Sequence, residues 1–210
     1  MGRIVLNISP ESDSDGICEA QTHSSGGTQN LTINGELSFS GTVSFISPHI
    51  IIITSVGNDS SRTFSVSGTD VRGATISESI TGGNASSVVT SNYFKTVTGI
   101  VINGNSSGEL TAGVDGRSSS NWGAVDTTGV NIGFGCVMST GGNFTYSMQH
   151  TFGDVQNLKD TEFYWFDQES LVDKTDNQDG NYAFGFTACR AVITAYTSGT
   201  LEVSLVGAER

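Results

Sequence analysis

Short runs of alternating apolar and polar residues, each ended by a glycine- or asparagine-rich turn, recur along almost the whole chain. Residues 63–67 read Thr-Phe-Ser-Val-Ser and stop at a turn over 68–70, and residues 74–80 stop at Gly-Gly-Asn over 82–84. Alternation with a period of two is typical of a strand with one buried face. Strands of this length, separated by turns roughly every eight to twelve residues, predict an antiparallel β-sandwich or barrel.

The composition supports this prediction. The chain has 210 residues, of which 27 are glycine, 2 are proline and only 14% are charged, whereas about a quarter of the residues in an average soluble domain carry charge. The polar positions hold mostly serine, threonine, asparagine and glycine, which are poor in helix interiors and common in strands and turns. An all-α or coiled-coil protein is therefore excluded, and we expect an all-β fold.

A polar segment at 115–121 divides the strand-rich sequence into two halves. We expect two antiparallel β-sandwich domains in tandem, jelly-roll or Ig-like, over residues 28–116 and 117–210. A weak repeat supports the division, because residues 101–110 align without gaps onto 192–201 and both predict a hairpin with a Ser-Gly turn. Residues 1–27 contain few core-forming side chains, and we expect them to form an extended N-terminal arm.

The charge of the chain excludes two classes of partner. Nine basic residues stand against 21 acidic ones, the net charge is −12, and the basic residues are scattered singly. Binding to nucleic acid needs clustered lysine and arginine, and an acidic surface is repelled by anionic lipid. The longest apolar run, residues 50–53, is far shorter than a membrane span. We expect neither nucleic acid nor a membrane as a partner.

One motif suggests a hydrolase. Residues 104–108 match the Gly-x-Ser-x-Gly pattern around Ser106, and Asp115 and His150 follow in the order of a catalytic triad. That motif needs a strand before the serine and a helix after it, but residues 109–114 read as a strand. A chain rich in serine and glycine produces the pattern by chance, so we expect no enzyme activity and no catalytic residue.

Metal and cofactor sites find little support. The three histidines, His23, His49 and His150, share no ligand spacing. The acidic stretch that ends in Asp179-Gly180 does not fit an EF-hand loop, because threonine and phenylalanine occupy its first and twelfth positions. An irregular calcium site built from loop carboxylates stays open against a solvated acidic loop; its residues are Asp173, Asp176 and Asp179. We expect no metal and no cofactor.

Three cysteines without Cys-x-x-Cys spacing form neither a disulfide framework nor a zinc site. Cys136 and Cys189 lie in strand-like runs and can pair if the strands are neighbours, but buried free thiols are the simpler interpretation. Cys18 is the third.

The densest aromatic stretch is Phe163, Tyr164, Trp165 and Phe166. Consecutive side chains in an extended segment point to opposite faces, so the four cannot all face one ligand. We expect them to pack in the core or at a subunit interface, and carbohydrate binding is the alternative.

Several segments resemble structural proteins of tailed bacteriophages, mostly short-tailed ones. The resemblance rests on both halves of the chain, and it covers residues 63–73, 77–84, 93–98, 149–155, 165–166 and 194–200. It implies a non-enzymatic role in the virion, as a capsid cement or decoration protein or as a head-to-tail adaptor or tail component. The implied partners are other virion proteins, namely the major capsid, portal/adaptor or tail proteins, and further copies of this chain. A receptor- or glycan-binding module of the tail is the alternative.

Overall fold

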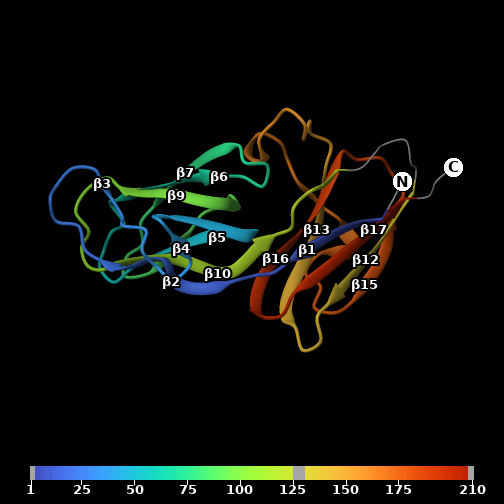
Figure 1. Ribbon diagram of the computed structural model, residues 1–210, viewed down its shortest axis with the longest axis horizontal. Coiled ribbons are helices and arrows are strands. Elements are labelled where there is room, and N and C mark those ends of the chain that lie inside the picture. The colour runs from blue at the N-terminus through green and yellow to red at the C-terminus, as the bar shows by residue number, and fades with distance from the viewer. Residues whose placement is uncertain (1–2, 125–130, 208–210) are drawn as a thin grey trace. The chain divides into compact units, whose positions relative to one another are not determined.

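The computed structural model describes residues 3–124 and 131–207, and within them it contains strands and two 3₁₀ turns but no α-helix (Figure 1). The strand pairings are antiparallel throughout both units. The expectation of an all-β chain with antiparallel sheets is confirmed. No helix in the described residues is long and apolar enough to span a membrane.

The chain divides into two compact units. Unit 1 comprises Met1–Pro10 together with Arg117–Arg210, and unit 2 comprises Glu11–Gly116. The boundary at 116/117 falls inside strand β10 (Leu110–Ser119), so the polar segment expected to be a linker is strand up to Ser119. The interpretation of the two halves as jelly-roll or Ig-like sandwich domains stays a prediction.

Unit 1 contains two sheets. The first has four strands in the order β1 (Ile4–Ile8), β17 (Leu201–Gly207), β12 (Ile132–Met138) and β15 (Gln178–Tyr182). The second has the order β14 (Phe166–Asp167), β13 (Asn143–Thr151) and β16 (Ala188–Ser198); β11 (Gly123–Ala124) and the last two residues of β10 also pair with β16.

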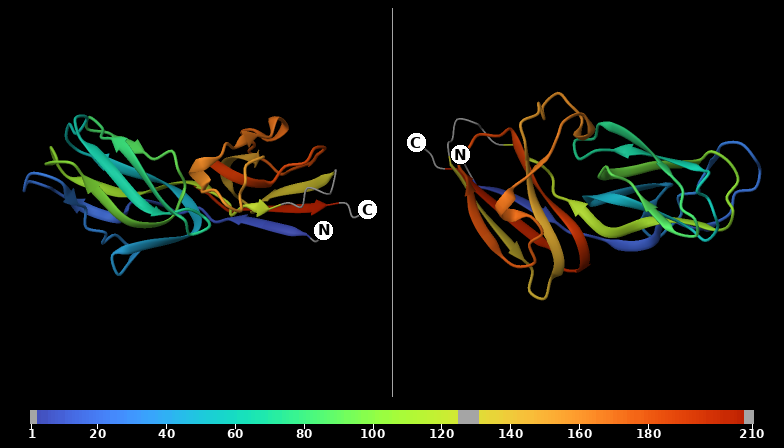
Figure 2. Two further views of the ribbon diagram at one scale, coloured as in Figure 1. Left: turned by 90° about the horizontal axis from the view of Figure 1, so that it is seen from above. Right: turned by 180° about the vertical axis from the view of Figure 1, so that it is seen from behind.

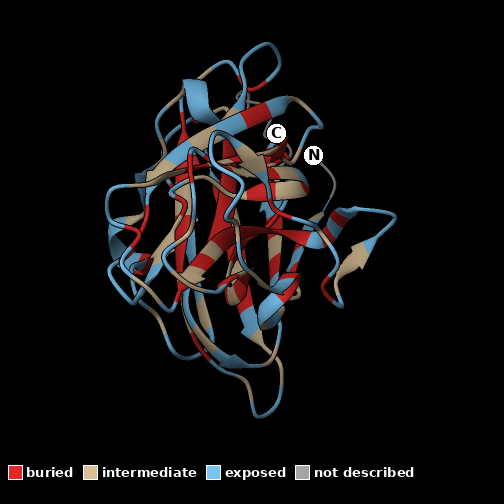
Figure 3. Cartoon of the chain, turned by 90° about the vertical axis from the view of Figure 1, so that its left-hand side faces the viewer, coloured by how far each residue is buried: buried red, intermediate tan, exposed pale blue. Residues whose placement is uncertain are grey.

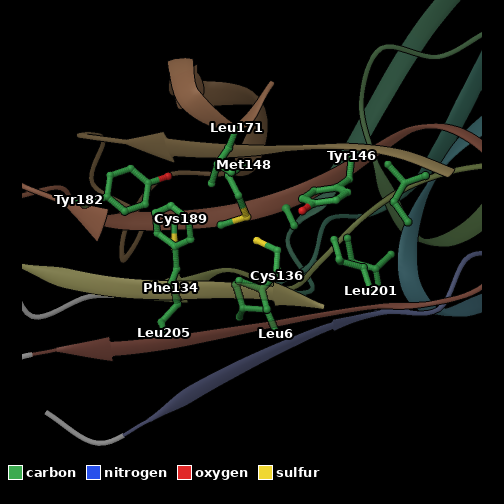
Figure 4. Packing of buried hydrophobic residues seen from close by; sticks show 14 of the residues in the cluster. Leu6, Phe134, Cys136, Tyr146, Met148, Leu171, Tyr182, Cys189, Leu201 and Leu205 are labelled. Carbon is green, nitrogen blue, oxygen red and sulfur yellow. The ribbon is translucent and has the colours of Figure 1, made fainter. Parts of the chain in front are cut away.

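Side chains from both sheets of unit 1 form one hydrophobic cluster (Figure 4). Leu6 of β1 and Phe134 of β12 lie on one side, and Met148 of β13 and Cys189 of β16 lie on the other. All four side chains are buried. The alternation of apolar residues along each strand produces this core, because every second side chain points to the same face.

Unit 2 is built around a sheet with the order β10, β5 (Thr42–Ser55), β9 (Phe94–Ile102), β6 (Thr63–Thr69) and β7 (Thr75–Thr81). Shorter or peripheral strands complete it: β2 (Ser12–Gln21) on β10, β3 (Gln29–Asn30) on β9, and β4 (Ser38–Phe39) and β8 (Ser87–Val89) on β5. A second cluster of buried apolar residues, among them Phe64, Phe94 and Ile100, forms its core. In Figure 3 the buried residues lie mainly along the strands and the exposed ones mainly in the connections.

The first 27 residues differ from the expectation. Ile4–Ile8 pairs with β17 from Ile4↔Leu205 to Ile8↔Leu201, and the two strands lie side by side in Figure 2 (blue and red). Ser12–Gln21 pairs with β10, and Ile17 and Cys18 are fully buried. These residues are therefore strands of the two units and not an extended arm. The physical reason is that Leu6 and Ile8 alternate along β1 and reach the core of unit 1, and that Ile17 and Cys18 of β2 reach the core of unit 2.

The long connection between β13 and β15 contains the two 3₁₀ turns, η1 (Asp160–Glu162) and η2 (Glu169–Leu171), as its Lys- and Glu-containing sequence suggests. The Ser-Gly turn at 198–199 does not form a hairpin: β16 pairs with β13, whereas β17 pairs with β1 and β12. It therefore connects strands of different sheets, and the hairpin predicted there is wrong.

Candidate functional site

The aromatic stretch at 163–166 is divided between two environments in unit 1. Phe163 and Trp165 are half-buried, whereas Tyr164 is 83% exposed and Phe166 is 50% exposed. This alternation follows from the extended backbone, which turns consecutive side chains to opposite sides. The four residues therefore do not form one surface.

Trp165 belongs to a buried polar cluster. Its Nε1 donates a hydrogen bond to Asp160 (2.7 Å), and the Arg190 guanidinium lies 4.2 Å from the centre of its ring. Arg190 and Asp160 form an ion pair at 3.1 Å, with side chains only 8% and 10% exposed. Trp122 contacts the rings of both Phe163 and Trp165. Because these groups satisfy one another, this cluster stabilises the loop and leaves little of itself for a ligand.

Phe166 contributes instead to an exposed aromatic surface, which we call the phenylalanine patch. It consists of Phe152, which follows β13, Phe166 of β14, and Phe184, which follows β15. The three side chains are 57%, 50% and 42% exposed. Phe152 lies 5.9 Å from Phe166 and 6.2 Å from Phe184 between ring centres.

His150, at the end of β13, is the centre of the patch. Its ring lies 5.1 Å from Phe184, 5.5 Å from Phe152 and 6.0 Å from Phe166, the last in a stacked arrangement. His150 is only 7% exposed, and its Nδ1 has no hydrogen-bond partner in the described part of the chain. The fully buried Tyr182 ring packs edge-on against it, 5.5 Å away between ring centres. The patch is therefore supported by the core of unit 1.

Burial lowers the pKa of His150, and the nearby Asp167 carboxylate opposes that shift. The imidazole is thus held in its neutral form near neutral pH, which suits an apolar surface. Asp167 itself accepts a hydrogen bond from the Gln149 side chain at 2.9 Å. A partly exposed group of aromatic rings on a neutral support is suited to contact with a protein or with the apolar face of a sugar.

Unit 1 also contains a shallow hollow of about 190 Å³. Part of its lining comes from the residues that directly follow Phe152 in the sequence. Its lining includes Gly153, Asp154 and Thr187. The Thr187 hydroxyl lies within hydrogen-bond distance of the carbonyl oxygens of Gly153 (2.7 Å) and Thr151 (2.9 Å) and donates its one proton between them, which fixes the segment after β13. The hollow thus has a partly polar lining, and none of the three patch phenylalanines belongs to that lining.

The sequence indicates Phe166 and His150 as candidate residues but does not predict that they lie together. Phe152 and Phe184 are not among those candidates. Each of these two stands two residues from another ring, in His150-Thr-Phe152 and Phe184-Gly-Phe186, so both rings of each pair are expected on the same face of a strand. The pairing of β13 with β14, which brings 150 opposite 166, joins residues too far apart in the sequence to be predicted from it.

The triad order around Ser106 has no structural counterpart within unit 2. The Ser106 hydroxyl donates to the Gly108 carbonyl (2.7 Å) and accepts from the His23 amide (3.0 Å). It therefore stabilises a turn. The His23 imidazole Nε2 has no hydrogen-bond partner among the described residues. His150, the third member by sequence, belongs to unit 1.

The acidic stretch does not converge on a point. The Asp173 amide donates to the Ser147 hydroxyl, and the Asp176 carboxylate accepts from the Gln178 side chain. Asp179 lies in β15, opposite Gly135. Within residues 3–124 and 131–207, no three histidine, cysteine or acidic side chains are placed to hold a metal ion.

The three cysteines are free and buried. Cys136 and Cys189 lie in the same cluster of unit 1 but in different sheets, and they do not form a disulfide. Burial raises the pKa of Cys136 to about 11 and that of Cys18 and Cys189 to about 12. None of them has the lowered pKa of a reactive thiolate.

Comparison with known proteins gives no family. No family model matches the chain, and no curated protein matches it. Among solved structures, the PBSX exported protein XepA is 11% identical, with 95% of this chain and 89% of that chain covered and a TM-score of 0.29. The stem and receptor-binding domain of the spike protein P1 from bacteriophage PM2 is 8% identical, with 99% and 97% covered and a TM-score of 0.23. Neither likeness is close enough to assign a fold family or a role.

Proposed function

We propose that this chain is a non-enzymatic structural protein of a bacteriophage virion, and that it binds other virion proteins through the phenylalanine patch. The observation that carries the proposal is the patch itself: three half-exposed phenylalanine rings around a buried, neutral His150. The largest contiguous apolar patch on a soluble monomer is typically about 300–600 Å² and often marks a functional contact. The resemblance of the sequence to phage structural proteins is the reason for proposing that the partners belong to a bacteriophage virion.

The patch is large enough to matter for binding. A phenylalanine side chain buries about 200 Å² when fully covered, so three half-exposed rings leave roughly 300 Å² to be buried by a partner. At about 25 cal/mol per Å², this corresponds to roughly 7 kcal/mol before the costs of association. Many symmetric copies in a particle reinforce such a contact.

The charge of the chain is consistent with a position away from packaged DNA. A net charge of −12 disfavours contact with phosphate. We therefore propose a place on the outside of the head, as cement or decoration, or at the head-to-tail junction or tail. The partners are then the major capsid, portal/adaptor or tail proteins and other copies of this chain. A particle reconstruction distinguishes these places, because copy number differs between head, neck and tail.

The test is incorporation into particles. Virions are assembled with the wild-type chain, with a Phe152→Ser/Phe184→Ser variant, or with Tyr164→Ser as the matched control. Tyr164 is more exposed than any residue of the patch but lies outside it. We expect the double variant to be lost from purified particles and the control to be retained. Equal incorporation of both, with both folded, contradicts the proposal.

A receptor- or glycan-binding module of a phage tail is the second candidate. The observation that favours it is the polar hollow at Gly153, Asp154 and Thr187, near exposed aromatic rings in the sequence. Sugars bind where an aromatic face lies beside hydrogen-bonding groups. A glycan array tests this alternative. Binding that is lost in Phe166→Ala but kept in Tyr164→Ser supports it, and an array without binding removes it.

A further inference from the structure

Strand β7 has a sequence that reads the same in both directions. Residues 75–81 are Thr-Ile-Ser-Glu-Ser-Ile-Thr, with Glu78 at the centre. When a strand of this kind pairs antiparallel with a copy of itself about Glu78, every residue lies opposite an identical one. Such self-complementarity is what a two-fold symmetric contact requires, because both partners present the same surface.

This strand also ends the sheet of unit 2. In the described residues β7 pairs with β6 along all seven positions, from Thr75↔Thr69 to Thr81↔Thr63, without a register shift. The neighbouring pairing of β6 with β9 is interrupted by such a shift. β7 contains no lysine, proline or bulge, three of the devices that prevent an edge strand from pairing, and Glu78 is its single charged residue. Its outer edge is therefore a regular template for another strand.

The two faces of β7 are suited to extension of the sheet. Ile76 is buried, and Ile80 packs against the hydrophobic core of the unit. The side chains on the opposite face are small and exposed; they are Thr75, Ser77, Ser79 and Thr81. A second strand in the proposed register continues the isoleucine row on one face and pairs hydroxyl side chains on the other.

Glu78 is the charged residue of β7, and self-pairing about it places it opposite Glu78 of the second copy. Its two carboxylate oxygens accept hydrogen bonds from the backbone amides of Ser91 (2.8 Å) and Asn92 (2.9 Å). The carboxylate is thus held toward the segment before β9 by two backbone donors. This arrangement reduces the repulsion that two opposed glutamates otherwise cause.

We propose that two copies of this chain associate by antiparallel pairing of their β7 strands about a two-fold axis at Glu78. Thr75 then lies opposite Thr81 of the second copy, Ile76 opposite Ile80, and Ser77 opposite Ser79. The backbone hydrogen bonds provide the affinity, as in other cases of strand addition, and the matched side chains set the register. This contact goes beyond the proposed function, which depends on the phenylalanine patch of unit 1.

The first test introduces charged residues at positions 77 and 79, whose partners in the second copy depend on the register of pairing. The full chain is examined by sedimentation equilibrium as wild type, as Ser77→Lys/Ser79→Lys, and as Ser77→Glu/Ser79→Lys. The first variant places lysine opposite lysine twice, and the second places glutamate opposite lysine twice. We expect a wild-type dimer, and about tenfold weaker association of the lysine pair than of the mixed pair.

The lysine variant is also the one with the smaller negative net charge, so general repulsion between acidic chains predicts the opposite order. Circular dichroism and thermal unfolding check that both variants fold. A wild type that stays monomeric at its highest soluble concentration overturns the proposal. Equal association of the two variants also overturns it.

The second test uses cross-linking. Ser77→Cys chains are mixed with Ser79→Cys chains under mild oxidation and compared with each variant alone. The native cysteines are buried and do not compete. Because residue 77 lies opposite residue 79 of the other copy, we expect disulfide-linked dimers mainly in the mixture. Equal cross-linking in each variant alone, or none in the mixture, refutes the register. Loss of particle incorporation in the patch variants is a separate outcome and leaves this result unchanged.

Discussion

His49 of unit 2 makes the stability of the chain depend on pH. The side chain is fully buried in β5, its Nδ1 donates to the Ser47 carbonyl (2.6 Å), and its Nε2 accepts from the Glu11 amide (2.9 Å). Both ring nitrogens are therefore satisfied only in the neutral imidazole, because a proton on Nε2 faces the N–H of Glu11. Burial lowers the pKa of His49 to about 4, a shift that the Ser47 hydrogen bond and the Asp115 carboxylate oppose.

The magnitude follows from linkage. An exposed histidine in the unfolded chain has a pKa of about 6.5, so the unfolded state binds the proton first as the pH falls. The stabilisation is fully present above pH 6.5 and is lost as the pH decreases towards 4. With a folded pKa of about 4, the loss is about 1.4 kcal/mol at pH 5.5 and about 3 kcal/mol at pH 4.

The assay is urea unfolding of the full chain at several pH values, followed by circular dichroism. Both tryptophans, Trp122 and Trp165, lie in unit 1, so tryptophan fluorescence reports that unit separately. The matched variant is His49→Gln, which does not titrate. At pH 7 we expect it to be the less stable chain, because it loses buried hydrogen bonds.

As the pH falls to 4, the free energies of unfolding of the two chains should converge by about 3 kcal/mol, and only for the transition of unit 2. Other groups that titrate in this range, such as Glu11, whose pKa burial raises, are present in both chains and cancel in the difference. If the two stability curves run parallel between pH 7 and pH 4, the buried neutral imidazole is not the cause and the reasoning is refuted.

Three further predictions concern packing and the buried charge. Asp160→Ala should lower the stability of unit 1 by about 3 kcal/mol, measured by tryptophan fluorescence in urea, because it removes the carboxylate from the buried Arg190; a cost below 1 kcal/mol contradicts this. Gly68→Ala should cost at least about 2 kcal/mol, since its Cβ would lie 1.8 Å from a backbone oxygen, whereas Gly99→Ala, with open space around it, should cost less than about 1 kcal/mol. The three thiols should stay unreactive towards a thiol reagent until the chain unfolds; a fast-reacting thiol in the native chain would show that one is exposed.

Local patterns predicted the strands where the pattern was complete. The alternating runs that begin at Thr63 and Ala74 became β6 and β7, with the predicted turn between them. The same reasoning failed for the first 27 residues, because Ile4, Leu6 and Ile8 are too few to suggest a core strand. Their partner is β17, about 200 residues away, and no local signal reports a pairing at that distance.

The aromatic stretch shows where the period-two argument succeeds and where it stops. Alternation alone states that Phe163 and Trp165 face one way and that Tyr164 and Phe166 face the other, and the structure agrees. Alternation does not predict which residues pack against each face of this segment. Arg190 packs against Trp165, and His150 with its neighbouring rings packs against Phe166, because other strands of the chain pair beside the loop. A functional surface in an all-β chain therefore depends on strand pairing more than on the composition of any one segment. The palindrome of β7 is an exception, because its proposed partner is the same segment and its register can be read from the sequence alone.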